Sequence, residues 1–201
     1  MERPLPAIAK AFQELEKEVE KGGEGVISVA AFAHACSLIS VLFGCLGMAF
    51  KFAEKDYVSK VQDLSKAANE FESLPAMIDY DIRNNSVRNG GSHTRNLLRV
   101  LRGVDMVRLL FQQILITEGN SLKDPASKAY DQVFARHHSW TIRKAVGAGM
   151  FLLPSKSQFL KKLNEEEDDA RVHIQGYATS SGPIVQYVTH LFLSKDLGTE
   201  W

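Results

Sequence analysis

Residues 25–50 read GVISVAAFAHACSLISVLFGCLGMAF and contain no Asp, Glu, Lys or Arg. A helix of this length is long enough to cross a bilayer. However, His34, Ser37 and Ser40 interrupt the run, and the charged helical sequence KFAEKDYVSKVQDL follows it directly at residues 51–64. A helix that is apolar on every side is also what the centre of a two-layer helical protein requires. We therefore expect a buried central helix, and a membrane span is the less favoured alternative.

Helical periodicity extends from this segment in both directions. On the N-terminal side a stripe of apolar side chains precedes the loop GGEG at residues 22–25, and it consists of Ile8, Phe12, Leu15 and Val19. On the C-terminal side helices are expected at about 65–83, with a kink at Pro75, and at about 93–117. We find no alternation typical of strands, so the sequence predicts an all-α fold.

Three further boundaries complete the expected order of helices. Asp124 can cap a helix whose first position is Pro125. Pro154 and the sequence SSGP at residues 180–183 predict two later breaks, with a charged helix between them and a final helix after them. The sequence thus predicts about eight helices.

Length and composition favour one neutral domain. The 201 residues can bury one substantial core, and we expect a single domain over 1–201. Lys plus Arg and Asp plus Glu are both 24, so any preference for anions must be local. Cys36 and Cys45 are too far apart along one helix for a disulfide, which indicates reduced cysteines. With no apolar signal sequence at the N-terminus, the expected location is the cytoplasm.

Three arginines share one face of the helix expected at 93–117. Arg95, Arg99 and Arg102 follow an i, i+4, i+7 spacing, which places their guanidinium groups along two turns. A solvated helix face is the ordinary interpretation of such a stripe. The same face continues, however, into the mostly apolar residues Met106, Leu109, Leu110 and Gln113. This change of character suggests the mouth of an apolar pocket.

A second helix repeats this pattern. Asp56 and Lys60 are an i, i+4 pair, and the same face runs backward through the apolar positions Phe52, Ala49, Cys45 and Leu42. Alone, the pair is more typical of a weak surface ion pair. Beside the arginines it predicts a polar cluster at the entrance of an apolar core, provided that the charged ends of the two helices meet.

Other chemistries have little support in the sequence. The histidines lack partners at zinc-like spacing, and the acidic run at residues 165–169 lacks the ligand pattern of a calcium loop. No nucleophile motif, phosphate loop or dinucleotide fingerprint occurs, so we expect neither enzymatic activity nor a cofactor. The neutral charge and the absence of aromatic residues within the basic stripe argue against nucleic acid as a partner.

Four segments carry a resemblance to a known family. They are FAHACSLISVLFGCLGMAFKFAEKDYVSKV (32–61), GSHTRNLLRVLRGVDMV (91–107), NSLKDPASKAYDQVFARHHSWTIRKAV (120–146) and LFLSKDLGTEW (191–201). In order and spacing they resemble the glycolipid-transfer-protein superfamily, and within it the branch that transfers ceramide-1-phosphate. The resemblance implies a two-layer helical sandwich that encloses a hydrophobic lipid pocket with a head-group site at its surface.

The resemblance also implies roles for individual residues. Asp56 corresponds to the family's ligand of the ceramide amide nitrogen, and His138 to the ligand of its acyl carbonyl. Lys60, Arg95 and Arg99 stand where they can bind a phosphate, with Lys60 and Arg99 replacing the asparagine and the tryptophan of glycolipid-binding members. Two further residues have secondary parts, since Arg102 resembles a supporting charge and Trp140 an exposed tryptophan that contacts membranes.

We therefore expect a protein that is not an enzyme and that moves ceramide-1-phosphate and related phosphorylated ceramides between membranes without vesicles. Its partners are then the lipid itself and, transiently, membrane surfaces. The alternative is a lipid-gated sensor or interaction protein in sphingolipid and cell-death signalling.

Overall fold

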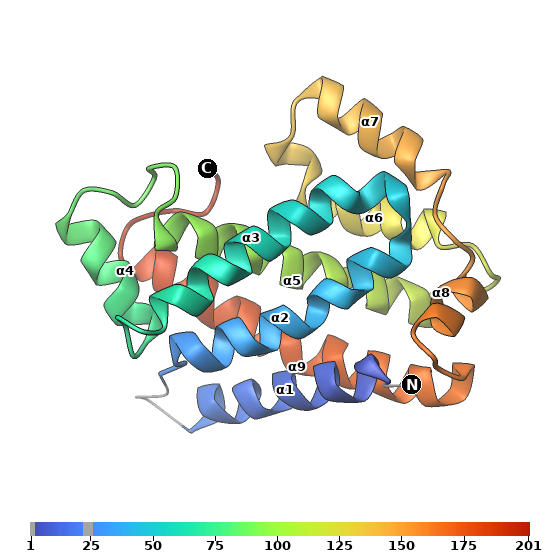
Figure 1. The fold of residues 1–201 in the computed structure, drawn as a ribbon, viewed down its shortest axis with the longest axis horizontal. Helices are drawn as coiled ribbons and strands as arrows, with labels where there is room; N and C mark the ends of the chain where they lie inside the picture. Colours follow the sequence, from blue (N-terminus) through green and yellow to red (C-terminus); the bar gives the residue numbers. More distant parts are fainter. Residues whose placement is uncertain (1–2, 22–25) are drawn as a thin grey trace.

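Helices account for the secondary structure of the part of the chain that the computed structural model describes, residues 3–21 and 26–201 (Figure 1). The all-α prediction is confirmed, with more helices in this part than the eight expected. The expected loop at 22–25 lies outside the described residues. The helices follow one another in the order α1 (Pro4–Glu20), α2 (Val29–Leu46), α3 (Lys51–Ala67), α4 (Leu74–Arg83), α5 (His93–Ile116), α6 (Lys123–Val133), α7 (Trp140–Met150), α8 (Lys156–Lys162) and α9 (Glu167–Ser194), with 3-10 turns at Met48–Phe50 and Ala135–His137.

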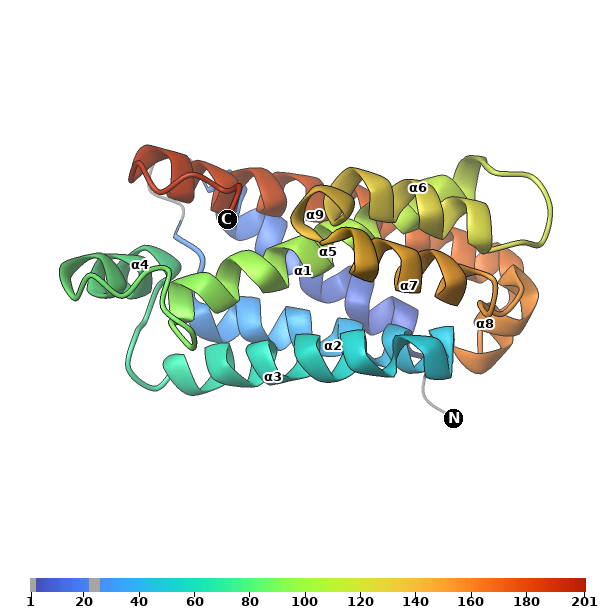
Figure 2. The ribbon, with the colours of Figure 1, turned by 90° about the horizontal axis from the view of Figure 1, so that it is seen from above.

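The long helices form two layers. Helix α2 packs between α1 and α3, whereas α5 packs between α6 and α9. Contacts of α1 with α9 and of α3 with α5 join the layers (Figure 2). Helix α7 lies over the edge near α3 and α6, and the short helices α4 and α8 lie at opposite ends of the molecule (Figures 1 and 2). This arrangement confirms the expected two-layer sandwich.

The apolar segment forms a helix inside this sandwich. By length and composition α2 could cross a membrane, but Val29, Phe32, Cys36 and Ile39 along it are fully buried against the rest of the protein. Ser28 caps the helix by accepting a hydrogen bond from the backbone N–H of Ala31 at 3.0 Å. The helix thus packs in the interior of the protein, as we expected from the sequence in preference to a membrane span.

A sharp corner separates α2 from α3. Gly47 has a φ of +101°, a backbone conformation that residues other than glycine rarely adopt. The chain turns there through Met48–Phe50 into α3. The face that we expected to continue from Lys60 back to Leu42 is therefore interrupted. Leu42 is buried, whereas Phe52 is 89% exposed on the outer side of the corner.

Prolines and caps shift three other predicted boundaries. Pro75 does not kink a helix but lies in the first turn of α4, which Ser73 caps, because a missing N–H costs nothing there. Asp124 lies inside the first turn of α6, and the N-cap position belongs to Leu122. Pro183 lies within α9, which continues through residues 180–183 because Tyr177, Ser181 and Ile184 pack fully buried on both sides of it.

One close contact brings α3 and α5 together beside the predicted site. A Cβ atom at Gly103 of α5 would lie 2.6 Å from the ring of Tyr57 on α3, so only glycine allows this approach. The Tyr57 hydroxyl donates a hydrogen bond to the Cys36 carbonyl of α2 at 3.0 Å. Tyr57 thus joins three helices, and the adjacent Asp56 is placed near α5.

Candidate functional site

A cavity of about 470 Å³ is lined by residues of α3, α5, α6 and α7. Apolar side chains form most of its wall. They come from the end of α2 and the corner after it, from α5, from α7, and from the residues that follow α6 and α7: Phe43, Leu46, Phe50, Met106, Val107, Leu110, Phe134, Val146, Met150 and Leu153. Its polar rim contains Asp56, Lys60, Arg99, Arg102 and His138. One cavity therefore combines an apolar interior with a cluster of cationic and hydrogen-bonding groups, as an amphiphile requires.

Two of the three cations that were predicted to bind phosphate line this cavity, and they lie on different helices. Lys60 extends from α3 and Arg99 from α5, and the close approach at Gly103 brings these helices together. The Lys60 ammonium group forms an ion pair with the Asp56 carboxylate one turn earlier on α3. The charged ends of the two stripes do meet, which helical periodicity alone could not establish.

His138 is held by an aromatic pair on and after α6. Its Nδ1 lies 2.9 Å from the Tyr130 hydroxyl, and its ring stacks on Phe134 with centroids 5.5 Å apart. Burial and the nearby charges of Arg102 and Arg99 lower the pKa of His138, against an opposing effect of Asp56. The lowered pKa favours a neutral ring at pH 7. If Nδ1 accepts from the Tyr130 hydroxyl, the Nε2–H is left to donate into the cavity.

Arg102, which the family resemblance marked only as a supporting charge, hydrogen-bonds to the C-terminal segment. Its Nη2 donates hydrogen bonds of 2.7 Å to the carbonyl oxygens of Thr199 and Trp201. Burial and the neighbouring Arg99 lower the pKa of Arg102 to about 10, which still leaves it charged at neutral pH. Arg102 thus fastens the segment 197–201 beside the cavity.

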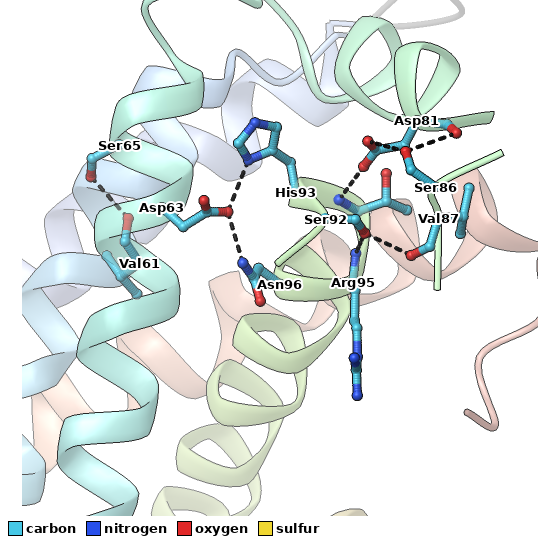
Figure 3. A network of polar contacts seen from close by, with 11 residues as sticks. Val61, Asp63, Ser65, Asp81, Ser86, Val87, Ser92, His93, Arg95 and Asn96 are labelled. Atoms are coloured by element: carbon cyan, nitrogen blue, oxygen red, sulfur yellow. Dashed lines mark hydrogen bonds and ion pairs between the residues drawn. The ribbon is translucent and has the colours of Figure 1, made fainter. Parts of the chain in front are cut away.

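Arg95 does not line the cavity. It begins the stripe on α5, and a Cβ atom at Gly90 in the preceding loop would lie 3.7 Å from its guanidinium nitrogen Nη1. Its backbone N–H donates to Ser92, which caps α5 (Figure 3).

In the same region Asp63 of α3 lies 2.9 Å from Nδ1 of His93 and 2.8 Å from Nδ2 of Asn96, and these contacts tie α3 to α5 (Figure 3).

Trp140 is the first residue of α7 and does not line the cavity either. Its side chain is 67% exposed, and the Lys144 ammonium group lies 5.6 Å from the centre of its ring. Ser139 caps the helix by accepting a hydrogen bond from the Ile142 N–H. The exposed ring is therefore placed on the outer surface of the helix that covers the cavity.

The sequence did not identify five residues that complete the polar end of the cavity. They are Tyr130, Arg136, His137, Glu200 and Trp201. Arg136 and His137 stand beside the predicted His138, and Glu200 and Trp201 end a segment that carried the family resemblance. The charges of these residues can be read from the sequence. Nothing in the sequence indicates, however, that Arg136 and Glu200, which are 64 positions apart, share one cavity.

The sequence is similar to those of known lipid transfer proteins. The glycolipid transfer protein family profile matches residues 27–165. The chain is 54% identical over 201 residues to Accelerated cell death 11 of Arabidopsis thaliana, covering all of this chain and 97% of that protein. It is 32% identical over 143 residues to the ceramide-1-phosphate transfer protein of Danio rerio, covering 65% and 68% of the two chains.

Solved structures show the same fold. A crystal structure of a single-residue mutant of Arabidopsis accelerated-cell-death 11 in complex with C12 ceramide-1-phosphate superposes with a TM-score of 0.97 at 53% identity, over 100% of both chains. The human ceramide-1-phosphate transfer protein shares the fold, with a TM-score of 0.81 at 18% identity over 95% and 96% of the chains. The chain belongs to the glycolipid transfer protein family.

Proposed function

We propose that this protein transfers ceramide-1-phosphate and related phosphorylated ceramides between membranes. The observation that carries this proposal is the single cavity with apolar walls and the cations Lys60 and Arg99 at its rim. Relatives named for ceramide-1-phosphate transfer, and a similar structure bound to that lipid, support it. No step of this function makes or breaks a bond, and the protein works from the cytoplasm with brief visits to membrane surfaces.

The phosphate is bound where the two helices meet. Lys60 and Arg99 donate charge-assisted hydrogen bonds to its oxygens, each contributing on the order of 1.5–3 kcal/mol. Arg95, one turn before Arg99, is the third phosphate ligand in this proposal, and its side chain must turn from Gly90 toward the cavity when the lipid binds. Arg102 remains on the carbonyl groups of the segment 197–201 and adds positive potential.

The ceramide backbone is recognised by one acceptor and one donor. The Asp56 carboxylate accepts from the amide N–H of the lipid, and the neutral His138 ring donates from Nε2 to the acyl carbonyl. The Tyr130 hydroxyl, 2.9 Å from Nδ1, donates to it in this proposal, which leaves the proton of the neutral ring on Nε2. The acyl and sphingoid chains occupy the apolar part of the cavity, where burial contributes roughly 0.8 kcal/mol per CH₂ group.

Exposed apolar side chains surround the helices that cover the cavity. Trp140 and Ile142 lie on α7, and Met48 and Phe52 lie on the α2–α3 corner, where Met48 is 81% and Phe52 is 89% exposed. The corner and α7 are neighbours, since a Cβ atom at Gly149 would lie 3.6 Å from that of Ala49. We infer that this surface enters the membrane interface, with the indole of Trp140 at the level of the lipid head groups.

Replacement of Trp140 tests this surface. Trp140→Ala should weaken partitioning onto phosphatidylcholine vesicles about tenfold in sedimentation assays while the melting temperature changes little, because the ring is exposed in the free protein. Val172→Ala is the control, since Val172 is 68% exposed on α9, away from α7. A collapse of the melting temperature with normal vesicle binding of the folded fraction would assign Trp140 to the core instead.

Transfer between vesicles tests the function itself. Substoichiometric protein should move ceramide-1-phosphate from donor to acceptor vesicles at least tenfold faster than galactosylceramide, at equal vesicle charge. A neutral sugar head group would leave the cations at the rim desolvated without a partner. Equal rates for the two lipids would contradict the proposed selectivity. Stoichiometric binding without turnover would favour the sensor, and a change in lipid mass would reveal an enzyme.

A further inference from the structure

An ion pair between two unpredicted residues lies at the polar end of the cavity. Nη1 of Arg136, in the turn after α6, lies 3.4 Å from Oε2 of Glu200, and both residues line the cavity. The side chains are 61% and 65% exposed. An ion pair this accessible to water adds little to the stability of the fold, about 0–1 kcal/mol. Its position beside Arg99, Arg102 and His138 therefore needs another explanation.

The backbone around Glu200 is held firmly although its side chain is exposed. Arg102 donates to the carbonyl oxygens of the residues on both sides of it, Thr199 and Trp201, at 2.7 Å each. The indole Nε1 of Trp201 donates to the Leu197 carbonyl at 3.0 Å, and the Arg88 guanidinium lies 5.2 Å from the centre of the indole ring. These contacts fix the Glu200 backbone beside the cationic cluster, while its exposed carboxylate is contacted by Arg136 and by the Thr199 hydroxyl, each at 3.4 Å.

The charges explain what a carboxylate does at this place. Among the residues that line the cavity, the cations Lys60, Arg99, Arg102 and Arg136 face two carboxylates, Asp56 and Glu200. Asp56 already pairs with Lys60 on α3, so Glu200 is the anion that pairs with Arg136 and lies next in sequence to the two carbonyl groups bound by Arg102. In agreement with this placement, Glu200 counteracts the lowering of the pKa values of Arg102 and His137.

We propose that Glu200 is the internal counter-anion of the empty head-group site and that the lipid phosphate displaces it from Arg136, which makes Arg136 a further head-group ligand. Glu200 then determines how tightly the site holds a phosphate. The carboxylate is removed from its cation when the lipid enters, and it returns when the lipid leaves. A carrier needs this balance because it must release its lipid at the acceptor membrane.

The exchange is favourable on charge alone. A phosphomonoester carries about −1.5 to −2 charges near pH 7, against −1 for the carboxylate, so it attracts Arg136 more strongly. The carboxylate moves into water without leaving a buried group unpaired, because it is already largely exposed. The proposal rests on the proposed function, since it assumes that Lys60 and Arg99 bind the phosphate.

A double-mutant cycle with ceramide-1-phosphate tests the proposal. Glu200→Gln removes the competing charge and should tighten the equilibrium binding of fluorescent ceramide-1-phosphate, measured against phosphatidylcholine vesicles, about three- to tenfold. Arg136→Gln should weaken binding about three- to tenfold. In the double variant the gain from Glu200→Gln should disappear, because Arg136 is no longer there to be released. A merely structural pair would instead weaken binding when either side chain is changed.

Controls separate this test from overall charge and from the proposed function. Glu167→Gln removes a carboxylate that is also exposed, at 66%, and also ion-paired, 2.6 Å from Lys156 on α8, and it should leave binding unchanged. Glu200→Asp keeps the charge and should behave more like the wild type than Glu200→Gln. Unchanged or weaker binding by Glu200→Gln, or a gain that persists without Arg136, would overturn the proposal. Failure of the wild type to bind the lipid at all would instead refute the proposed function.

Discussion

Asp56→Val should abolish the transfer of every sphingolipid, with a loss of at least about 100-fold for ceramide-1-phosphate. The ceramide amide N–H would lose its anionic acceptor at the polar rim of the cavity, and Lys60 would lose the partner that now holds its ammonium group. The fold should persist because the Asp56 side chain is 66% exposed and its ion pair contributes only about 0–1 kcal/mol. Vesicle transfer assays together with circular dichroism measure the two effects separately.

The chain offers a closely matched control for this variant. Glu14 on α1 is also an acid in an i, i+4 pair with a lysine, Lys10, and its side chain is 63% exposed. Helix α1 contributes no residue to the lining of the cavity. Glu14→Val should therefore transfer lipid at the wild-type rate. If Asp56→Val does the same with an unchanged circular dichroism spectrum, Asp56 has no part in lipid recognition.

Arg99→Leu should weaken the binding of ceramide-1-phosphate by about 30-fold to nearly 1000-fold, which corresponds to roughly 2–4 kcal/mol. The variant loses at least one charge-assisted hydrogen bond and leaves the phosphate insufficiently neutralised at the junction of α3 and α5. Inorganic phosphate should compete only weakly with the lipid in either protein, since apolar burial of the two chains supplies much of the binding energy. Equilibrium binding and transfer rates with ceramide-1-phosphate provide the measurement.

The same substitution elsewhere on α5 shows whether the effect is specific. Arg108 is 21% exposed, pairs with Asp105 at 2.6 Å and does not line the cavity. Arg108→Leu is expected to retain the preference for ceramide-1-phosphate over galactosylceramide, even if it lowers the melting temperature. Arg99→Lys should fall between the wild type and Arg99→Leu because it keeps the charge but not the planar fork. Normal transfer by Arg99→Leu would reduce the arginine stripe to a solvated helix face.

Local signals located several helices well and misplaced others. Ser92 before His93 marks the start of α5, and the side-chain cap is present as such signals predict. Gly47 and Pro183 were harder to interpret. The corner at Gly47 requires a positive φ angle that only the path of the whole chain demands, and Pro183 is tolerated in α9 because the surrounding helices bury both of its neighbouring turns. In both places tertiary packing decided against the local preference.

The sequence by itself determined the kind of protein. Apolar helical periodicity specified the all-α class, and the change from cationic to apolar along one face of α5 indicated a pocket for an amphiphile. Both properties belong to single helices, so the sequence shows them whatever the packing of the helices. The family resemblance supplied the ceramide-1-phosphate branch and the roles that we propose for Asp56 and His138.

Only the tertiary structure decided which side chains share the cavity. It placed Lys60 beside Arg99 through the contact of Tyr57 with Gly103, left Arg95 outside the lining, and turned Arg102 toward the segment 197–201. It also brought Glu200, in the segment that follows the C-terminal end of α9, to Arg136. The physical reason is that charges on different helices interact over a few ångströms in space, and the crossing of the helices fixes those distances independently of any spacing along the chain.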